Sequence, residues 1–144
     1  MKFKYKQKYY EYVVEIAESQ DTLDTPQKVF EIIKDNFSPI QESLWLIMLN
    51  TQNNIISTIE VSKGKHNSMM IDPKEIFIHL IKNGSPNFII AHNHPSFTLK
   101  PSEEDLIMTR KVLKGSKLLG LQFLDHLIFT DKDFHSFRHN HEVF

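Results

Sequence analysis

The apolar residues of four segments repeat at the 3.6-residue period of a helix that buries one face. In two of these segments a residue able to cap a helix precedes a proline, which is typical of a helix start, and glycines mark the expected ends of the last two. The predicted helices run over Tyr9–Ser19, from Thr25-Pro26 through Ile33, from Asp72-Pro73 to Asn83-Gly84, and from Ser102 to Gly115 or Gly120.

Four other segments are short, nearly continuous apolar runs of the kind found in buried strands. They are Leu44–Leu49, Ile55–Val61, Phe88–Ala91 and Leu121–Thr130, and the turn-like Asn50–Asn54 joins the first two as a hairpin. Because strands and helices are interleaved, we expect a single α/β or α+β domain over residues 25–144, with a mixed sheet flanked by helices. Residues 1–24 are expected to form a helical extension.

The chain of 144 residues carries eight histidines and no cysteine. The lack of cysteine excludes a disulfide, a thiolate zinc site, a catalytic thiol and an iron–sulfur cluster, so histidine, aspartate and glutamate are left to bind a metal. With 17 Lys and Arg against 18 Asp and Glu, the net charge is −1, which gives no global basic field for nucleic acid. The sequence has no membrane-length apolar run and no secretory signal pattern, and we expect a cytoplasmic protein.

The clearest pattern among the histidines is His92-Asn93-His94, followed after seven residues by Ser102 and then Asp105. Side chains two apart on an extended backbone point the same way, so the two imidazoles can reach one ion. Asp105, one turn into the next helix, can add a carboxylate. Two histidines and one aspartate match the three protein ligands of a catalytic zinc site, which leaves a fourth position for water.

Each part of this pattern also has a simpler explanation. The tripeptide recurs as His139-Asn140-His141 without a downstream Ser-x-x-Asp, and we expect this copy on a solvated tail, where with His135 it could bind an adventitious metal. The pair Ser102 and Asp105 is also similar to a capping box at a helix start. Capping and metal binding can coexist, with Ser102 holding the helix start while Asp105 turns to the ion.

The stretch AHNHPS…PSEED, with its H-x-H, seven residues, S-x-x-D spacing, resembles the JAMM signature of the JAB/MPN metalloproteases. The chain is most similar to the RadC-like bacterial branch, over roughly Thr25 to Phe137. The resemblance implies the JAB/MPN fold, a cytidine-deaminase-like mixed sheet flanked by helices. The matching pieces are Leu49-Asn50-Thr51, Glu60-Val61, Gly64, Asn67-Ser68, Pro73–Phe77, Ala91–Ser96, Pro101-Ser102, Asp105, Leu119-Gly120 and Leu124-Asp125-His126.

The resemblance also implies a metallohydrolase that cleaves a peptide or isopeptide amide through a metal-activated water. One Zn2+ per chain would be bound by His92, His94 and Asp105. Ser102 would hydrogen-bond the water or the developing oxyanion.

Further residues gain a role only through the resemblance. Glu60 would be the general base and acid, although nothing in the residues themselves singles out Glu60 over Glu42 or Glu75. Asp125 and His126 match the family as well, either in a second shell behind the metal ligands or as structural residues at a strand end.

The partners are the least defined part of the prediction. The resemblance implies a protein or peptide substrate, and Phe97–Lys100, which replaces the family's Gly and acidic residue, is expected to change substrate preference or access. The alternative is a nucleic-acid-associated accessory protein of the DNA-repair kind linked to RadC, with a structural or repurposed metal site. Its support is a basic stripe at Lys2, Lys4, Lys6 and Lys8. We expect no membrane partner, no upstream helix-hairpin-helix region of longer RadC proteins, and either a monomer or a homodimer.

Overall fold

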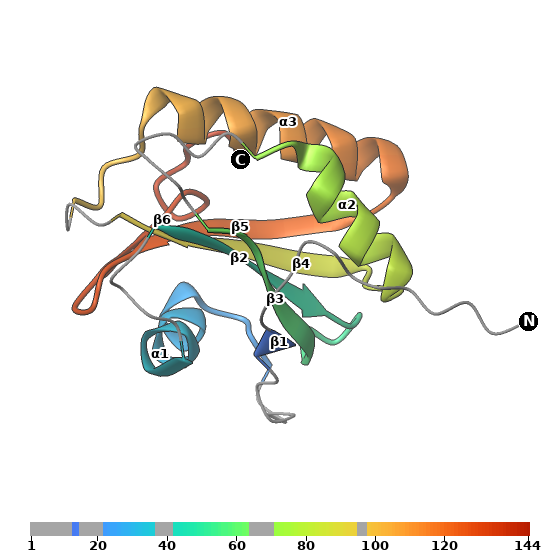
Figure 1. The fold of residues 1–144 in the computed structure, drawn as a ribbon, viewed down its shortest axis with the longest axis horizontal. Helices are drawn as coiled ribbons and strands as arrows, with labels where there is room; N and C mark the ends of the chain where they lie inside the picture. The colour runs from blue at the N-terminus through green and yellow to red at the C-terminus, as the bar shows by residue number, and fades with distance from the viewer. Residues whose placement is uncertain (1–12, 15–21, 37–41, 64–70, 95–97) are drawn as a thin grey trace, which may run out of the picture.

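The computed structural model describes residues 13–14, 22–36, 42–63, 71–94 and 98–144, which form one sheet with helices on both faces (Figure 1). The strands are β1 (Val13–Val14), β2 (Ser43–Leu49), β3 (Ile55–Lys63), β4 (Asn87–Asn93), β5 (Gln122–Phe129) and β6 (Phe134–Ser136). The helices are α1 (Pro26–Asn36), α2 (Pro73–Lys82) and α3 (Glu103–Leu119).

The sheet has the strand order β1-β3-β2-β4-β5-β6 and is mixed. Strands β4 and β5 run parallel, as a crossover through α3 requires, and all other neighbours are antiparallel. The molecule is therefore a single α+β domain, as predicted, and this arrangement is consistent with the JAB/MPN fold.

Strand β2 lies near the centre of the sheet and is buried along its whole length, which explains its continuous apolar run. Alternate side chains enter two separate cores. Trp45 and Ile47 belong to the core that includes residues of α1, whereas Leu46 and Met48 belong to the core that includes residues of α2 and α3. Figure 1 shows α1 on one face of the sheet and α2 and α3 on the other. The two helical layers thus cover opposite faces, and the period of two in each strand decides which layer a side chain meets.

The predicted helix boundaries are confirmed at α2 and α3. Asp72 caps α2 by accepting a hydrogen bond from the backbone N–H of Lys74, and Ser102 caps α3. Of the two glycines considered for the end of α3, Gly120 is the C-cap, with a left-handed φ of 71°. Gly115 lies inside the helix, where an added Cβ would come within 2.6 Å of the Phe77 ring, so this glycine allows α2 and α3 to pack closely.

Two parts of the predicted order are corrected. Val13 and Val14 form β1 on the edge of β3 and are not helical; the rest of the helix predicted over Tyr9–Ser19 lies outside the described residues. Valine is β-branched and favours strands, and this preference outweighs the helical spacing of the apolar residues in the segment. The sequence pattern also gave no sign of β6, which is only three residues long and contains a single buried residue, Ser136.

The far edge of the sheet is formed by the C-terminal segment. β6 pairs only with Leu127–Phe129, and beyond it Arg138 donates through its guanidinium to the carbonyls of Phe123 and Leu124 on β5. The guanidinium carbon lies 4.6 Å from the centre of the Phe144 ring. No helix of the described part of the chain is long and apolar enough to cross a lipid bilayer.

Candidate metal centre

His92 and His94 lie at the carboxyl end of β4, where this strand ends and the loop before α3 begins. His92 continues the face of Phe88 and Ile90, so its ring enters the layer between the sheet and α3. Asp105 reaches the same place from the first turn of α3. A fourth group comes from Glu42, the residue before β2, because Leu44 pairs with His92 across the antiparallel ladder and brings Glu42 alongside.

The ring Nε2 atoms and the carboxylates of these residues converge. His94 Nε2 lies 3.1 Å from Asp105 Oδ2, and His92 Nε2 lies 3.5 Å from Asp105 Oδ1. Glu42 Oε1 lies 3.6 Å from His92 Nε2. One ligand atom from each of Glu42, His92 and His94 falls within 4.8 Å of the others, which is the only such group in the described part of the chain. Asp105, which the sequence predicts as the third ligand, lies beside both histidines, but it is not a member of that group, whose third member is Glu42.

The orientation of His94 is fixed from the loop. Its Nδ1 lies 2.9 Å from the carbonyl oxygen of Thr98, and a carbonyl can only accept, so Nδ1 carries a hydrogen. In the neutral ring Nε2 then has a lone pair, and this lone pair faces the Asp105 carboxylate. Thr98 belongs to the segment 97–100 that departs from the family pattern; Phe97 lies outside the described residues.

These atoms form a site that favours a positive charge. Burial lowers the pKa of His94, but the hydrogen bond and the negative charge of Asp105 outweigh it and raise that pKa above its usual value. Burial raises the pKa of Asp105, but the hydrogen bond from His94 and the charge of His92 bring it well below its usual value. Lone pairs of two imidazoles beside two carboxylates repel one another unless a cation or a proton lies between them. The donor set, two nitrogens with carboxylate oxygens, suits a divalent metal ion.

Asp105 also forms the capping box considered from the sequence. Ser102 Oγ accepts from the Asp105 backbone N–H at 3.1 Å, and Asp105 Oδ2 accepts from the Ser102 N–H at 2.8 Å. The cap and the contacts to the histidines therefore coexist, and the cap holds the carboxylate in place. A hydrogen bond between the Ser102 side chain and the Asp105 carboxylate also helps to keep the pKa of Asp105 low.

Of the two glutamates, Glu42 rather than Glu60 lies next to His92. Glu60 Oε1 accepts a 2.6 Å hydrogen bond from Ser43 Oγ, and Glu60 forms no ion pair with His92 or His94 within the described part of the chain. Glu42, one residue before Ser43, carries the carboxylate next to His92. The sequence offered little to find it: Glu42 stands just before a buried apolar run, but only the pairing of β2 with β4 brings it to the histidines.

The adjacent residues Asp125 and His126 point to opposite faces of β5. His126 is fully buried and touches the site, with Nε2 at 3.1 Å from His92 Nδ1. Burial, followed by the positive charge of His92, lowers the pKa of His126 well below its usual value.

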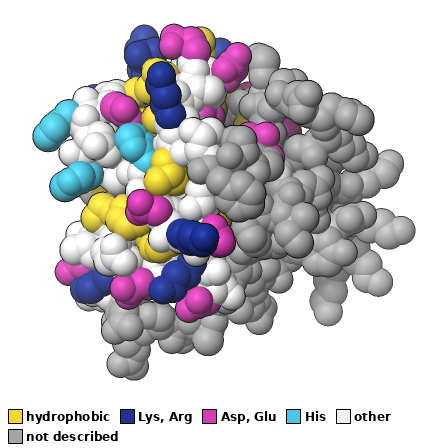
Figure 2. Space-filling model, turned by 90° about the vertical axis from the view of Figure 1, so that its left-hand side faces the viewer, with side chains coloured by type: hydrophobic (Ala, Val, Ile, Leu, Met, Phe, Trp, Pro, Cys, Tyr) yellow, Lys and Arg dark blue, Asp and Glu magenta, His cyan; other side chains and the backbone are white. Residues whose placement is uncertain are grey.

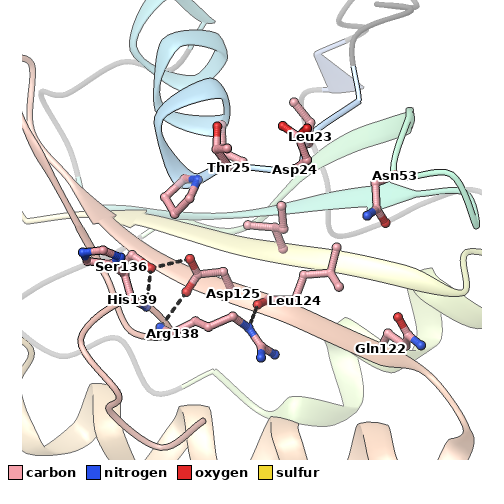
Figure 3. Close-up of a pocket in the computed structure, with 13 residues that line it drawn as sticks. Leu23, Asp24, Thr25, Asn53, Gln122, Leu124, Asp125, Ser136, Arg138 and His139 are labelled. Atoms are coloured by element: carbon pink, nitrogen blue, oxygen red, sulfur yellow. Dashed lines mark hydrogen bonds between the residues drawn. The ribbon is translucent and has the colours of Figure 1, made fainter.

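Asp125 lies on the α1 side, where it lines a cavity of about 550 Å³ and accepts from Ser136 Oγ at 2.5 Å and from the Arg138 N–H at 3.0 Å (Figure 3). The structure brings only His126 of this pair to the candidate metal centre. Asp125 instead ties the end of β6 to β5, a structural role.

The second histidine tripeptide does not form a comparable group. His139 and His141 are exposed in the turn that follows β6, and His135 Nε2 lies 2.6 Å from Glu142 Oε2. Figure 2 shows the left-hand side of the molecule as drawn in Figure 1, with acidic and basic side chains interspersed over its described part. This mixture matches the near-zero net charge.

The fold and this centre define a class: a small α+β domain in which the end of a central strand and the start of a helix hold a His/His/carboxylate group. The sequence model of the RadC-like JAB domain matches residues 23–142, and the chain belongs to that family.

Curated relatives support the assignment. The chain is 37% identical over 122 residues to a UPF0758 protein of Aquifex aeolicus, covering 85% of this chain and 53% of the relative. It is 37% identical over 121 residues to one from Clostridium perfringens, covering 83% and 53%. With a UPF0758 protein of Streptococcus suis the identity is 42% over 103 residues, covering 72% and 42%. The chain thus spans about half the length of the relatives it matches.

Proposed function

We propose that this domain is a zinc-dependent hydrolase of peptide or isopeptide amides, with Glu42 rather than Glu60 as the general base. The observation that carries the proposal is the convergence of His92 Nε2, His94 Nε2 and the Asp105 carboxylate, with Glu42 Oε1 3.6 Å from His92. Zinc held by the two histidines and Asp105 would lower the pKa of a water molecule toward neutrality and polarise a substrate carbonyl.

The residues of the chain divide the remaining work. Glu42 takes a proton from the attacking water as the C–O bond forms, and returns it to the amine nitrogen as the C–N bond breaks. Ser102 donates its hydroxyl hydrogen to the oxyanion that develops on the carbonyl oxygen. Glu60 supports this arrangement indirectly, because its bond to Ser43 fixes the residue next to Glu42.

The test begins with metal content, measured by elemental analysis of untagged wild type, His94→Ala and Asp105→Ala purified identically. About one zinc per chain in the wild type, lost in both variants, is the expected result. Fluorogenic peptide and isopeptide substrates are then screened with Glu42→Gln and Glu60→Gln as a matched pair. Glu42→Gln should keep zinc and lose roughly 10²–10⁴-fold in turnover, while Glu60→Gln keeps both.

Three results would overturn the proposal. Zinc that survives both ligand substitutions would remove the proposed centre. Glu42→Gln with wild-type turnover would remove the base, and loss of turnover confined to Glu60→Gln would return that role to Glu60.

The nucleic-acid alternative rests on Lys2–Lys8, which lie outside the described residues, and nothing in the described part of the chain adds to it. It would be favoured by DNA binding that weakens steeply as salt rises.

A further inference from the structure

We propose that Thr109 and His126 are positioning residues that fix the ring tautomer of His92 through a one-directional chain of hydrogen bonds ending on the backbone of Asp105. The inference deepens the proposed function, since it takes His92 Nε2 as the atom that faces the metal. It concerns two residues that touch neither the substrate nor the ion.

This chain of hydrogen bonds has three links, all in the layer between the sheet and α3. His92 Nδ1 lies 3.1 Å from His126 Nε2, His126 Nδ1 lies 2.7 Å from Thr109 Oγ1, and Thr109 Oγ1 lies 2.6 Å from the carbonyl oxygen of Asp105. His92, Thr109 and His126 are each at most 1% exposed, so water does not compete for these bonds.

The carbonyl at the end of the chain sets its direction. Thr109 has one hydroxyl hydrogen, and the Asp105 carbonyl can only accept. Two oxygen atoms 2.6 Å apart repel unless a hydrogen lies between them, so the Thr109 hydrogen points to Asp105. This back-bond to the carbonyl four residues earlier is common for threonine in a helix.

The direction of the Thr109 hydroxyl hydrogen determines the positions of the other hydrogens in the series. Thr109 Oγ1 must accept from His126, so His126 carries its hydrogen on Nδ1 and presents a lone pair at Nε2. His92 in turn donates from Nδ1 to that lone pair, which leaves its own Nε2 without a hydrogen and directed at Asp105 and Glu42. The opposite direction would place a hydrogen on His92 Nε2 and block it as a metal ligand.

The ring of His126 is held in a position where its two nitrogens can bond His92 and Thr109. It stacks on Phe137 with ring centres 4.3 Å apart and planes within 8°. Asp105 lies at both ends of this series of hydrogen bonds. Its backbone carbonyl accepts the last bond, and its carboxylate faces the His92 Nε2 that carries no hydrogen. His94 obtains the same tautomer from the Thr98 carbonyl, so each histidine is oriented by a carbonyl, one directly and one through two intermediates.

The test is to read the tautomer of His126 from its ring nitrogen shifts by NMR, in the metal-free and the zinc-loaded chain at neutral pH. The expected state in both is Nδ1–H with a bare Nε2. A hydrogen on His126 Nε2 in either form would overturn the proposal. The metal-free measurement is valid even if the chain fails as a hydrolase or binds no zinc, so failure of the two proposals can be told apart.

Variants test the consequence for metal binding by competition with a chelator. Thr109→Val should weaken zinc binding roughly 10–100-fold, and Thr109→Ser should restore it. Ser116→Ala is the matched control, because Ser116 is also buried on α3 and bonds the carbonyl four residues earlier, at 2.6 Å, but forms no hydrogen bond with a histidine of the described part of the chain. Unchanged zinc affinity in Thr109→Val, or an equal loss in Ser116→Ala, would overturn the proposal. If Thr109→Val does not fold, the tautomer measurement on the wild type decides.

Discussion

The side-chain oxygen of Asn93 accepts a 2.8 Å hydrogen bond from the backbone N–H of Ser43, joining the start of β2 to the end of β4. Asn93 lies between the two histidines, and Ser43 follows Glu42. The bond is buried, and together with the pairing of Leu44 and His92 it holds the strand end that carries the imidazoles next to the residue before β2 that is the proposed base.

Replacing Asn93 by alanine should therefore loosen the start of β2. The N–H of Ser43 loses a buried acceptor, and we expect a stability loss of about 1–3 kcal/mol. Hydrogen exchange at the Ser43 amide should speed up relative to the wild type. Asn87→Ala is the control, because Asn87 is buried at the other end of β4, where it bonds Asn53. That variant should lose stability without faster exchange at Ser43, and equal exchange in both would contradict the assigned role of Asn93.

Metal removal should destabilise the domain, because the converging carboxylates and lone pairs lose the cation that separates them. With free zinc at 100 times the dissociation constant, binding adds about 2.7 kcal/mol to the folded state. In a domain of this size that raises the Tm by roughly 10 °C, measured by thermal unfolding with and without chelator. His94→Ala should abolish the shift. His139→Ala, which removes an exposed histidine, should retain it, and a shift that persists in His94→Ala would place the ion elsewhere.

Gly115→Ala should destabilise the chain even though alanine is the better helix former. The new Cβ would come within 2.6 Å of the Phe77 ring, and such overpacking costs about 1–3 kcal/mol. Urea unfolding of Gly115→Ala, Phe77→Leu and the double variant measures the coupling. The double variant should be more stable than the sum of the single losses predicts. A gain of about 1 kcal/mol in Gly115→Ala alone would show that α2 and α3 are less closely packed than described.

Asp125 should make stability fall as the pH rises. Burial raises the pKa of Asp125 above its usual 3.8, more than the bonds from Ser136 and Arg138 lower it. The folded chain therefore holds this proton more tightly than the unfolded chain, so the contribution is fully present below about pH 3.8 and is lost as the pH rises through the folded pKa.

The test measures the free energy of unfolding of Asp125→Asn and of the wild type as a function of pH. The difference should move in favour of the variant as the pH increases from about 3 to about 7. The exposed Asp131→Asn controls for the loss of one negative charge. A difference that stays constant, or moves the other way, would contradict the raised pKa.

Much of this architecture follows from local signals in the sequence. The runs Leu44–Leu49 and Phe88–Ala91 predict central strands because both faces are buried, and Asp72-Pro73 and Ser102 predict helix starts because their side chains cap them. The two histidines and Asp105 could be grouped for the same reason, since one strand end and the next helix start carry all three.

What the sequence could not supply depends on contacts between distant segments. Glu42 lies 50 residues before His92, and only the register of β2 against β4 brings it there; no periodicity encodes that pairing. His126 and Thr109 meet because β5 returns parallel to β4 beneath α3. Val13 and Val14 form a strand because the edge of β3 offers them partners, which their own spacing does not reveal.

The guanidinium of Arg138 has a consequence for how the molecule behaves in a crowded solution. A bare strand edge invites another chain to add a strand, and this is a common start of aggregation. By occupying the carbonyls of Phe123 and Leu124, Arg138 removes the acceptors that an incoming strand would need along the part of β5 that β6 leaves uncovered. The C-terminal segment thus leaves fewer free backbone acceptors along this part of β5.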